Sequence, residues 1–490
     1  MSQHRSWSGR HELHVGSLIG TRWFDGAGDL AQRANPADEQ PLSSAHLITA
    51  TEMQDAIATA ERARAGWAKT PFHDRAEVLV RASDAFLARD AELAELLTLE
   101  QGKPLAEALA EVRRSARILR FFASEADRES GDVFNSPRID EHIRVVHRPR
   151  GVIALITPWN FPVAIPIWKL APALVYGNTV VWKPAGIVPA LSAVMARILV
   201  EAGLPEGVLN LTHCAPAVAQ ELVTSPVVGA ISFTGSTAVG THIITAAAAT
   251  RTPVQAEMGG KNVTIVMADA DLDLVTDSLV EGSMGSSGQR CTASERLLVD
   301  VRIAEELLER IAARVDRLTV GDGLDPQTDI GPVATATAKK DIQAAFEAAV
   351  RGGARQLAAS ALEDRAGHFV APTLFEIQDT TSPIWTDEVF GPVLAAKRFD
   401  TFGEALALAN ETPYGLSAAV FTDTHSVVER AAELNVGVLH INSATIGADP
   451  HVPFGGIAAS GYGPKEQGGA ARDFYTNSQT IYEKWVPKSE

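Results

Sequence analysis

Cys291 is the side chain in this sequence that is best suited to nucleophilic chemistry. It follows a polar, glycine-punctuated segment, residues 282–290, which we expect to lie outside the hydrophobic core. A thiol there is accessible, and the positive charge of the adjacent Arg290 favours the nucleophilic thiolate. The other cysteine, Cys214, ends an apolar run that is typical of a buried strand. A lone cysteine is more often an incidental free thiol, so the rest of the sequence must decide between the two interpretations.

Composition narrows the class of protein. The chain has 490 residues, 46% hydrophobic and 21% charged, which is ordinary for a globular enzyme of about two or three domains. The net charge of −17 argues against nucleic acid or an anionic membrane surface as a partner. Two cysteines exclude a disulfide framework and fit a reducing compartment. Residues 1–7 lack an apolar signal region, and no stretch reaches about 18 apolar residues, so we expect a cytoplasmic protein.

A short strand and turn are expected at 18–28, and three helical stretches follow, at 51–69, 74–100 and 106–125. The second divides into two helices near Asp90, and Gly102, followed by Pro104, ends it. The third carries a group of arginines that could form a solvated face or a cationic mouth for an anionic substrate, and the pattern leaves both open. These arginines are Arg113, Arg114, Arg117 and Arg120.

Short apolar strands then alternate with helices, a pattern that predicts a parallel sheet with a nucleotide site at the carboxyl ends of its strands. A second alternating set extends over 263–442 and includes a strand expected at 369–374. The fold class is therefore α/β with two doubly wound domains. The first set of strands is expected at 152–156, 179–183, 208–211 and 229–233.

A strand, a glycine turn and a helix meet at residues 233–240, where helix N-terminal amides could bind a phosphate. The segment lacks the Lys-Ser/Thr pair of a P-loop, and the chain contains no G-x-G-x-x-G motif. A purely structural tight turn explains this segment equally well.

Six short motifs occur in order along the chain and together resemble those of the aldehyde dehydrogenase superfamily, over about residues 16–487. The resemblance implies NAD(P)-dependent oxidation of an aldehyde to a carboxylic acid, through a thiohemiacetal and a thioester on cysteine. The motifs are Thr-Pro-Trp-Asn-Phe-Pro at 157–162, Phe-Thr-Gly-Ser at 233–236, Glu-Met-Gly-Gly-Lys at 257–261, Gly-Gln-Arg-Cys at 288–291, Glu-Val-Phe-Gly-Pro at 388–392 and Pro-Phe-Gly-Gly at 453–456.

The same resemblance implies the catalytic residues. Cys291 would be the nucleophile, because its thioester still hydrolyses readily. The Asn160 amide and the Cys291 backbone N–H would form the oxyanion hole. Glu257 would be the general base for the thiol or for the deacylating water, with a strand-end carboxylate in a salt bridge as the alternative. Lys169 and Glu466 resemble a proton-relay pair, in a segment, 463–468, that is one residue longer than the common form.

The resemblance also implies a nicotinamide cofactor and no metal. Lys183 would bond the adenine ribose, and Gly235 with Ser236 would meet the pyrophosphate. Glu388 would hold the nicotinamide ribose, with Phe390 beside the ring. The full predicted cofactor set is Thr157, Pro158, Trp159, Lys183, Gly186, Gly235, Ser236, Gly259, Glu388 and Phe390.

Gly186 departs from many NAD-preferring members, which carry a glutamate three residues after the lysine that matches Lys183. The missing carboxylate would otherwise repel a 2′-phosphate. We therefore expect that NADP is accepted and hypothesise that it is preferred, with NAD as the alternative cofactor.

The substrate side combines aromatic residues with one cation. Phe161, Trp168 and Phe454 resemble the lining of the family's aldehyde tunnel, and Arg114 falls at its mouth. The motifs around Cys291 and at 451–468 are most similar to those of 2,5-dioxopentanoate (α-ketoglutaric semialdehyde) dehydrogenases. A short semialdehyde that bears a carboxylate is therefore expected. Succinate semialdehyde or a broad range of aldehydes, aromatic ones included, are the alternatives.

Other activities on the same scaffold are less consistent with these residues. CoA-acylating members generally lack the glutamate at Glu257, and non-catalytic crystallin-like relatives tend to lose the nucleophile. Ala458 replaces a lysine common in the family, with no effect that we can assign.

The predicted domains are a Rossmann-like cofactor domain (1–134 and 152–256), a catalytic domain (257–450), and an oligomerisation arm with a C-terminal segment (135–151 and 451–490). The strand-like pieces at 139–150 and 474–485 have no partner inside either core. In the family such pieces form an arm that pairs across subunits, so a homodimer or homotetramer is expected.

Overall fold

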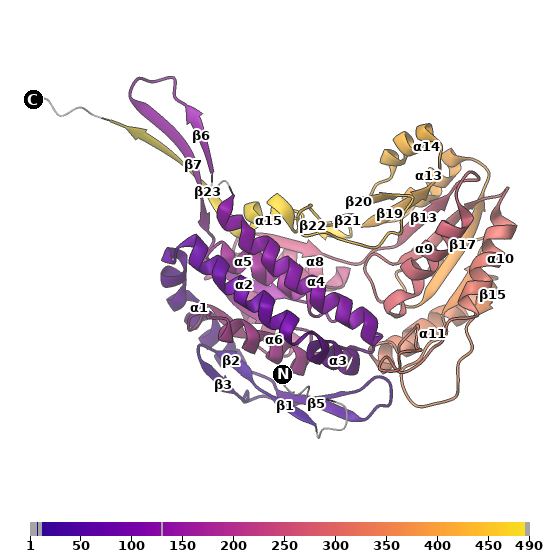
Figure 1. Cartoon of the computed structure of the whole chain (residues 1–490), viewed down its shortest axis with the longest axis horizontal. Coiled ribbons are helices and arrows are strands. Elements are labelled where there is room, and N and C mark those ends of the chain that lie inside the picture. The colour runs from indigo at the N-terminus through magenta and orange to yellow at the C-terminus, as the bar shows by residue number, and fades with distance from the viewer. Residues whose placement is uncertain (1–6, 8–11, 129–130, 486–490) are drawn as a thin grey trace, which may run out of the picture.

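The computed structural model describes residues 7, 12–128 and 131–485. It has two lobes in which helices pack on sheets, and a narrow arm projects from the first lobe (Figure 1). This arrangement confirms the α/β fold class. Within the described residues, no helix is both long and apolar enough to cross a membrane. The expectation about a signal region concerns residues 1–7, which apart from Trp7 lie outside the described part of the chain.

The first lobe is built on an eight-stranded sheet in the order β22-β12-β11-β8-β9-β10-β2-β3. Its five central strands are parallel, as the alternation predicted. The chain adds β9 and β10 on one side of β8, and β11 and β12 on the other, so the topological switch point lies between β8 and β11. The central strands are β8 (Val152–Ile156), β9 (Thr179–Lys183), β10 (Leu209–Leu211), β11 (Val228–Thr234) and β12 (Val254–Glu257).

Short antiparallel strands complete the edges of this sheet: β2 (Ser17–Ile19) and β3 (Arg22–Phe24) at one edge, and β22 (Gly461–Tyr462) at the other. The strand and turn expected near the N-terminus are confirmed. A separate three-stranded sheet was not predicted, because its strands are short and only partly apolar. It contains β1 (Leu13–Val15), β4 (Leu30–Ala34) and β5 (Pro41–His46).

Helices cover both faces of the first sheet, and β8 and α5 are buried along their whole length. Thr49 and Glu52 form a capping box at the start of α1, and Gly102 ends α3 with a φ of 102°, as its position predicted. The helices are α1 (Ala50–Lys69), α2 (Phe72–Ala88), α3 (Asp90–Gln101), α4 (Leu105–Ala123), α5 (Ala164–Val175), α6 (Pro189–Glu201), α7 (Pro216–Val223) and α8 (Thr237–Ala248).

The second lobe contains a seven-stranded sheet in the order β15-β16-β17-β14-β13-β19-β20, parallel except at β15. Its elements are β13 (Asn262–Val266), α9 (Leu272–Met284), β14 (Ser294–Asp300), α10 (Ala304–Val315), α11 (Ala336–Arg351), β15 (Arg355–Ala359), β16 (Thr373–Glu376), α12 (Pro383–Thr386), β17 (Val393–Phe399), α13 (Phe402–Asn410), β19 (Ser417–Phe421), α14 (His425–Arg430) and β20 (Val438–Ile441).

Sequence patterns missed parts of this lobe. The helix α11 and the edge strand β15 were not predicted, and β16 begins four residues later than the strand expected at 369–374. Of the residues in α11, Ile342 and Ala349 are buried, so this helix contributes little to the core. The strand β15 is half exposed at the sheet edge, where hydrophobic alternation is least marked.

The arm is a three-stranded antiparallel sheet of β6 (Gly131–Asn135), β7 (Glu141–Pro149) and β23 (Thr476–Lys484). It stands clear of both lobes in Figure 1. The strands β7 and β23 pair along their full lengths, from Thr476 opposite Pro149 to Lys484 opposite Glu141. The residues before β23 form a helix, α15 (Gly468–Tyr475), so the strand expected from residue 474 begins two residues later.

The chain crosses between the two lobes through residues 258–261, from the carboxyl end of β12 to the amino end of β13. Because this link is short, the carboxyl edge of the first sheet faces the amino edge of the second. Cys291 lies just before β14, which is the neighbour of β13, and is therefore at that same junction. The residue boundaries of the domains stay a prediction.

Candidate active site

A cavity of about 240 Å³ lies at the carboxyl ends of β8, β11 and β12, beside the switch point of the first sheet. Open α/β sheets bind ligands at this position. Trp159 and Phe390 meet edge to face there, with ring centroids 5.5 Å apart. The sequence-predicted residues that line the cavity are Pro158, Trp159, Asn160, Gly235, Ser236, Gly259, Cys291, Glu388 and Phe390.

The turn after β11 is built for close approach of a ligand to the backbone. Ser236 is the exposed N-cap of α8, and its hydroxyl accepts a hydrogen bond from the Val239 N–H. A Cβ on Gly235 would lie 2.6 Å from the Phe233 ring, so the packing favours glycine there. The N-terminus of α8 therefore borders this cavity through Gly235 and Ser236, and a helix N-terminus is a place where anions bind.

Three predicted cofactor residues do not line this cavity. The Thr157 hydroxyl accepts a hydrogen bond of 2.9 Å from the Trp182 indole, so it supports the sheet. Lys183 ends β9 beside the end of β8, and burial lowers the pKa of its ammonium group. Gly186 is exposed, and a Cβ there would meet no atom within 4 Å. A side chain at this position would fit, so sterics do not explain the glycine.

Glu388 approaches the cavity from the second lobe. Its Oε1 accepts a hydrogen bond of 3.0 Å from the Gly260 N–H. Burial and the nearby Glu295 carboxylate raise the pKa of Glu388 to about 8. A Cβ on Gly259 would come 2.1 Å from Glu388 Oε2, so a side chain there would displace this carboxyl group.

Cys291 lines two cavities at once, the one beside Trp159 and a second of about 490 Å³ on its other side. Its thiol is half-buried, and its carbonyl accepts a hydrogen bond of 2.7 Å from the Asn262 amide. Burial, followed by the carboxylates of Glu388 and Glu257, raises the pKa of the Cys291 thiol to about 12. In this structure the thiol is therefore protonated at neutral pH.

Two expectations about the surroundings of Cys291 were wrong. Residues 282–289 are buried, because the polar groups of this segment find partners inside the protein. Arg290 does not favour the thiolate: its guanidinium lies 3.5 Å from Glu107, while the side chains that affect the thiol are carboxylates. Sequence adjacency misled here, because the Arg290 side chain extends toward α4.

Glu257 ends β12 and is buried. Its Oε2 accepts a hydrogen bond of 2.9 Å from the Gly456 N–H, and it forms no ion pair with a described residue. Burial, together with the Glu466 carboxylate, raises the pKa of Glu257 well above its ordinary value. The alternative interpretation, a carboxylate in a salt bridge, is therefore not supported, because no described residue forms an ion pair with Glu257.

Lys169 and Glu466 form a buried ion pair. The Lys169 ammonium also donates a hydrogen bond of 2.9 Å to the Ser232 hydroxyl. Backbone hydrogen bonds in both directions join Glu466 to Phe454. The longer segment at 463–468 therefore still places Glu466 against Lys169.

Asn160 is buried in the turn after β8. Its carbonyl accepts a hydrogen bond of 2.8 Å from the Lys103 ammonium, which also pairs with Glu111 at 2.6 Å. The other oxygen of Glu111 accepts hydrogen bonds from the N–H groups of Val163 and Ala164. The turn that carries Asn160 is thus fixed by a buried polar network.

The cavity of about 490 Å³ contains the predicted substrate residues Arg114, Phe161, Trp168 and Phe454. The Trp168 and Phe454 rings lie 5.6 Å apart, so its inner wall is aromatic. Cys291 also lines this cavity, so a ligand that enters it can reach the thiol. The cavity therefore suits a small molecule with an apolar body.

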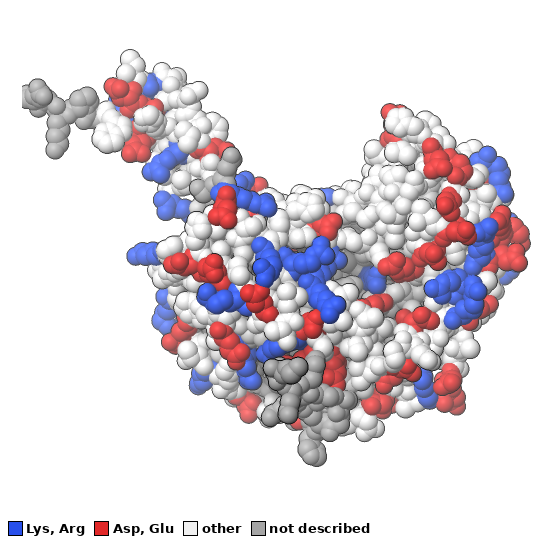
Figure 2. Space-filling view, viewed as in Figure 1, with Lys and Arg blue, Asp and Glu red and all other residues white. Residues whose placement is uncertain are grey.

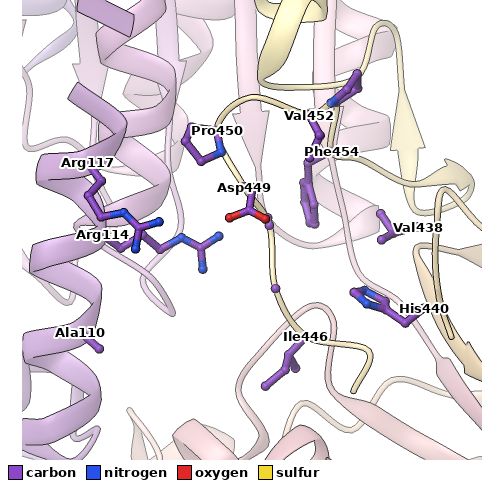
Figure 3. Close-up of a pocket in the computed structure, with 13 residues that line it drawn as sticks. Ala110, Arg114, Arg117, Val438, His440, Ile446, Asp449, Pro450, Val452 and Phe454 are labelled. Atoms are coloured by element: carbon purple, nitrogen blue, oxygen red, sulfur yellow. The ribbon is translucent and has the colours of Figure 1, made fainter. Parts of the chain in front are cut away.

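An outer cavity of about 510 Å³ adjoins this one and shares Arg114 with it (Figure 3). Arg114 and Arg117 point from α4 toward Asp449 (Figure 3). Arg114 has no hydrogen-bond or ion-pair partner among the described residues. Burial lowers the pKa of Arg114, and the Asp449 carboxylate opposes that effect. A half-buried cation without a partner is suited to an anionic ligand.

The arginines of this helix divide between the surface and a cavity, and the binding of an anionic substrate stays a prediction. Arg113 pairs with Asp90 and Arg120 with Asp84 on the surface. Figure 2 shows basic side chains gathered over the middle of the face drawn, where α4 lies in Figure 1. Arg114 and Arg117 instead line the outer cavity.

Sequence reasoning missed the buried polar groups that support the site. Lys103 and Glu111 hold the turn of Asn160, and Glu295, paired with Lys261, accepts hydrogen bonds from the N–H groups of the loop that precedes Phe390. Charged residues inside otherwise apolar helix and strand patterns were the available signal. Among the described residues, no cluster of His, Cys, Asp and Glu could hold a metal ion.

The family model for the aldehyde dehydrogenase family matches residues 23–481, so the chain belongs to this family. Its members oxidise aldehydes, and the chain is an oxidoreductase of that class.

Similar proteins include an alpha-ketoglutaric semialdehyde dehydrogenase from Bacillus subtilis, 38% identical over 96% of this chain and 98% of that protein. A 2,5-dioxopentanoate dehydrogenase from Saccharolobus solfataricus is 36% identical over 95% and 99%. Among solved structures, betaine aldehyde dehydrogenase from Staphylococcus aureus in complex with NAD+ has a TM-score of 0.93 and 31% identity over 97% of this chain and 96% of that chain. An NADP dependent enzyme from E. coli has a TM-score of 0.93 and 33% identity over 96% and 98%.

Proposed function

We propose that the protein catalyses NAD(P)-dependent oxidation of a carboxylate-bearing semialdehyde to the acid, with Cys291 as nucleophile. The observation that carries this proposal is the position of Cys291. This residue lines both the cavity at the sheet switch point and the aromatic cavity. A thiol between two such cavities can meet a cofactor on one side and an aldehyde on the other.

The residues at the switch point support a nicotinamide dinucleotide as the cofactor. Ser236 and the amides of α8 would hold the pyrophosphate, Lys183 the adenine ribose and Glu388 the nicotinamide ribose. The bare backbone at Gly235 and Gly259 leaves room for close approach. When bound, the cofactor supplies the acceptor for the hydride.

Cys291 attacks the aldehyde carbon as a thiolate. Because the pKa of the thiol is raised, the thiol holds its proton at neutral pH and must first transfer it to a base. The Asn160 amide and the Cys291 N–H stabilise the oxyanion. Glu257, whose pKa is also raised, is a stronger base once ionised and takes the proton from the thiol or, later, from the water that hydrolyses the thioester. The Lys169–Glu466 pair extends the proton path behind it.

The substrate class follows from Arg114 and the aromatic walls. An unpaired, half-buried guanidinium at the mouth favours a carboxylate far from the aldehyde group, as in 2,5-dioxopentanoate. The names of the similar proteins agree with this substrate. The aromatic pair Trp168 and Phe454 favours a second candidate, a broader specificity that includes aromatic aldehydes.

The test is a panel of aldehydes with both nucleotides, followed by the absorbance of the reduced cofactor. We expect the largest kcat/KM with 2,5-dioxopentanoate, below it succinate semialdehyde, and no requirement for CoA, since Glu257 provides for hydrolysis. Absence of reduced cofactor with every semialdehyde would contradict the enzyme role, and a preference for neutral aromatic aldehydes would favour the second candidate.

The exposed, sterically open Gly186 supports NADP as the preferred cofactor, because no carboxylate there repels a 2′-phosphate. Steady-state kinetics with saturating aldehyde should give a higher kcat/KM for NADP than for NAD. The reverse order would reject the preference without affecting the aldehyde chemistry.

Two cysteines in a chain of this length also support a reducing, cytoplasmic location.

A further inference from the structure

The backbone just before Cys291 is strained. Ser286 and Ser287 have φ angles of 51° and 56°, in the left-handed region that residues with side chains rarely adopt. Two such residues in succession persist only where the surroundings hold them in place. They form the turn that follows α9 and leads to the thiol, and this turn is called the serine turn below.

Contacts from two segments hold the serine turn and the residues that follow it. The Ser287 hydroxyl donates 2.8 Å to the Gly331 carbonyl, and the Ala334 N–H donates 2.9 Å to the Gln289 side chain. Both of these partners belong to the second lobe. The third contact comes from the first lobe: Glu107 on α4 accepts hydrogen bonds from the Ser286 N–H, at 3.0 Å, and from the Ser286 hydroxyl.

Glu107 also lies 3.5 Å from the Arg290 guanidinium, so one carboxylate contacts the turn at both ends. Arg290 is adjacent to the thiol in the chain. The carboxylate is half-buried and makes no other ion pair with a described residue. The hydrogen bonds and the ion pair of Glu107 with described residues all join it to the segment that carries Cys291.

The next turn of α4 contacts the other half of the site. Glu111, four residues after Glu107, holds the Asn160 turn through Lys103 and through the N–H groups that begin α5. Residues four apart lie on the same face of a helix. One face of α4 therefore reaches both the Cys291 segment and the Asn160 turn, which belong to different lobes. Figure 1 shows α4 extending along the first lobe toward the second.

We propose that Glu107 is a positioning residue for Cys291. It keeps the serine turn in its left-handed conformation and ties it to α4, so that the thiol stays aligned with the Asn160 turn, which Glu111 ties to the same helix. The inference rests on the proposed role of Cys291 as nucleophile.

The test compares Glu107→Ala and Glu107→Gln with Arg113→Ala, a control on α4 that removes only a surface ion pair. The measurements are kcat, KM for both substrates, the thermal midpoint, and the pH profile of Cys291 alkylation by iodoacetamide. Glu107→Ala should lower kcat by up to about 100-fold, as displacement of a reacting group does, and should shift the alkylation profile while KM for the nucleotide stays constant. Glu107→Gln keeps one acceptor oxygen and should lose less, and Arg113→Ala should match the wild type.

A double-mutant cycle with Ser286→Ala tests the route of the effect. If Glu107 acts through the serine turn, the combined loss in kcat is smaller than the product of the two single losses. Independent losses overturn the proposal. So does a Glu107→Ala enzyme with wild-type kcat and alkylation profile, whether or not its thermal midpoint falls. A Cys291→Ser enzyme with full activity would instead reject the proposed nucleophile.

Discussion

At the scale of single residues, the site contains buried ionisable groups that form few ion pairs. Glu257, Glu388 and Cys291 are all shifted toward their neutral forms, mainly by burial. Perturbed pKa values of this kind cluster where proton transfer and nucleophilic attack occur. Arg114 is the opposite case, a charged group that stays unpaired at the mouth of a cavity.

The pKa of Cys291 predicts a pH dependence. The thiol pKa of about 12 means that the thiolate fraction, and with it the rate of alkylation by iodoacetamide, keeps rising with pH in the cofactor-free enzyme, with no plateau below about pH 10. Above about pH 8, where Glu388 is ionised, Glu388→Gln removes a negative charge that disfavours the thiolate, so it should shift this part of the profile to lower pH. Mass spectrometry of the Cys291 peptide gives the rate, and the exposed Glu347→Gln is the control. A plateau near neutral pH would contradict the raised pKa.

Arg114 predicts a selective change in KM. A charged hydrogen bond contributes about 1.5–3 kcal/mol, so Arg114→Ala should raise KM for 2,5-dioxopentanoate about 10- to 100-fold. KM for a neutral aldehyde of similar length should change little. Arg113→Ala on the same helix is the matched control. Equal increases for both aldehydes would show that Arg114 shapes the cavity without binding the carboxylate.

At the scale of elements, α4 connects the parts of the site. It carries Glu107, Glu111 and Arg114 on the face that lines the substrate cavity. Its first residue approaches the second lobe, because the Leu105 N–H donates a hydrogen bond of 2.8 Å to the Gly323 carbonyl. The position of one helix thus affects the Cys291 segment, the Asn160 turn and the cavity beside Arg114 together.

The buried pair in this element predicts a stability effect. Lys103→Met leaves Glu111 buried without its cation, which should cost about 3–5 kcal/mol of unfolding free energy. Arg120→Met breaks an exposed pair with Asp84 and should cost at most about 1 kcal/mol. Urea unfolding followed by tryptophan fluorescence measures both. A Lys103→Met protein as stable as Arg120→Met would show that water or another group compensates Glu111.

At the scale of the whole molecule, the arm is the feature without an internal role. Its strands β6, β7 and β23 pair with one another and join neither of the two large sheets, and the arm exposes large apolar side chains. Val133 and Ile139 are 82% and 85% exposed. Edge strands and apolar residues of this kind are usually covered, and a second copy of the chain is the proposed partner.

The arm therefore predicts oligomerisation. Val133→Lys combined with Ile139→Lys should reduce the mass measured by light scattering toward that of the 52.1 kDa monomer, because burial of these side chains would then bury charges. Val350→Lys, at an exposed apolar position on α11, is the control. A monomeric wild-type protein would reject the proposal outright.

The sequence alone determined the family, the α/β class and most elements of the first lobe, because ordered motifs and buried parallel strands leave strong local signals. It also singled out Cys291, Asn160, Glu257 and Arg114 by type and motif, and their roles stay predictions. The tertiary structure decided how these groups are held. Arg290 turned out to pair with Glu107, the polar segment before Cys291 to be buried, and Lys103 with Glu111 to support Asn160. Such contacts join residues far apart in the chain, and neither periodicity nor adjacency encodes which distant charge a side chain will meet.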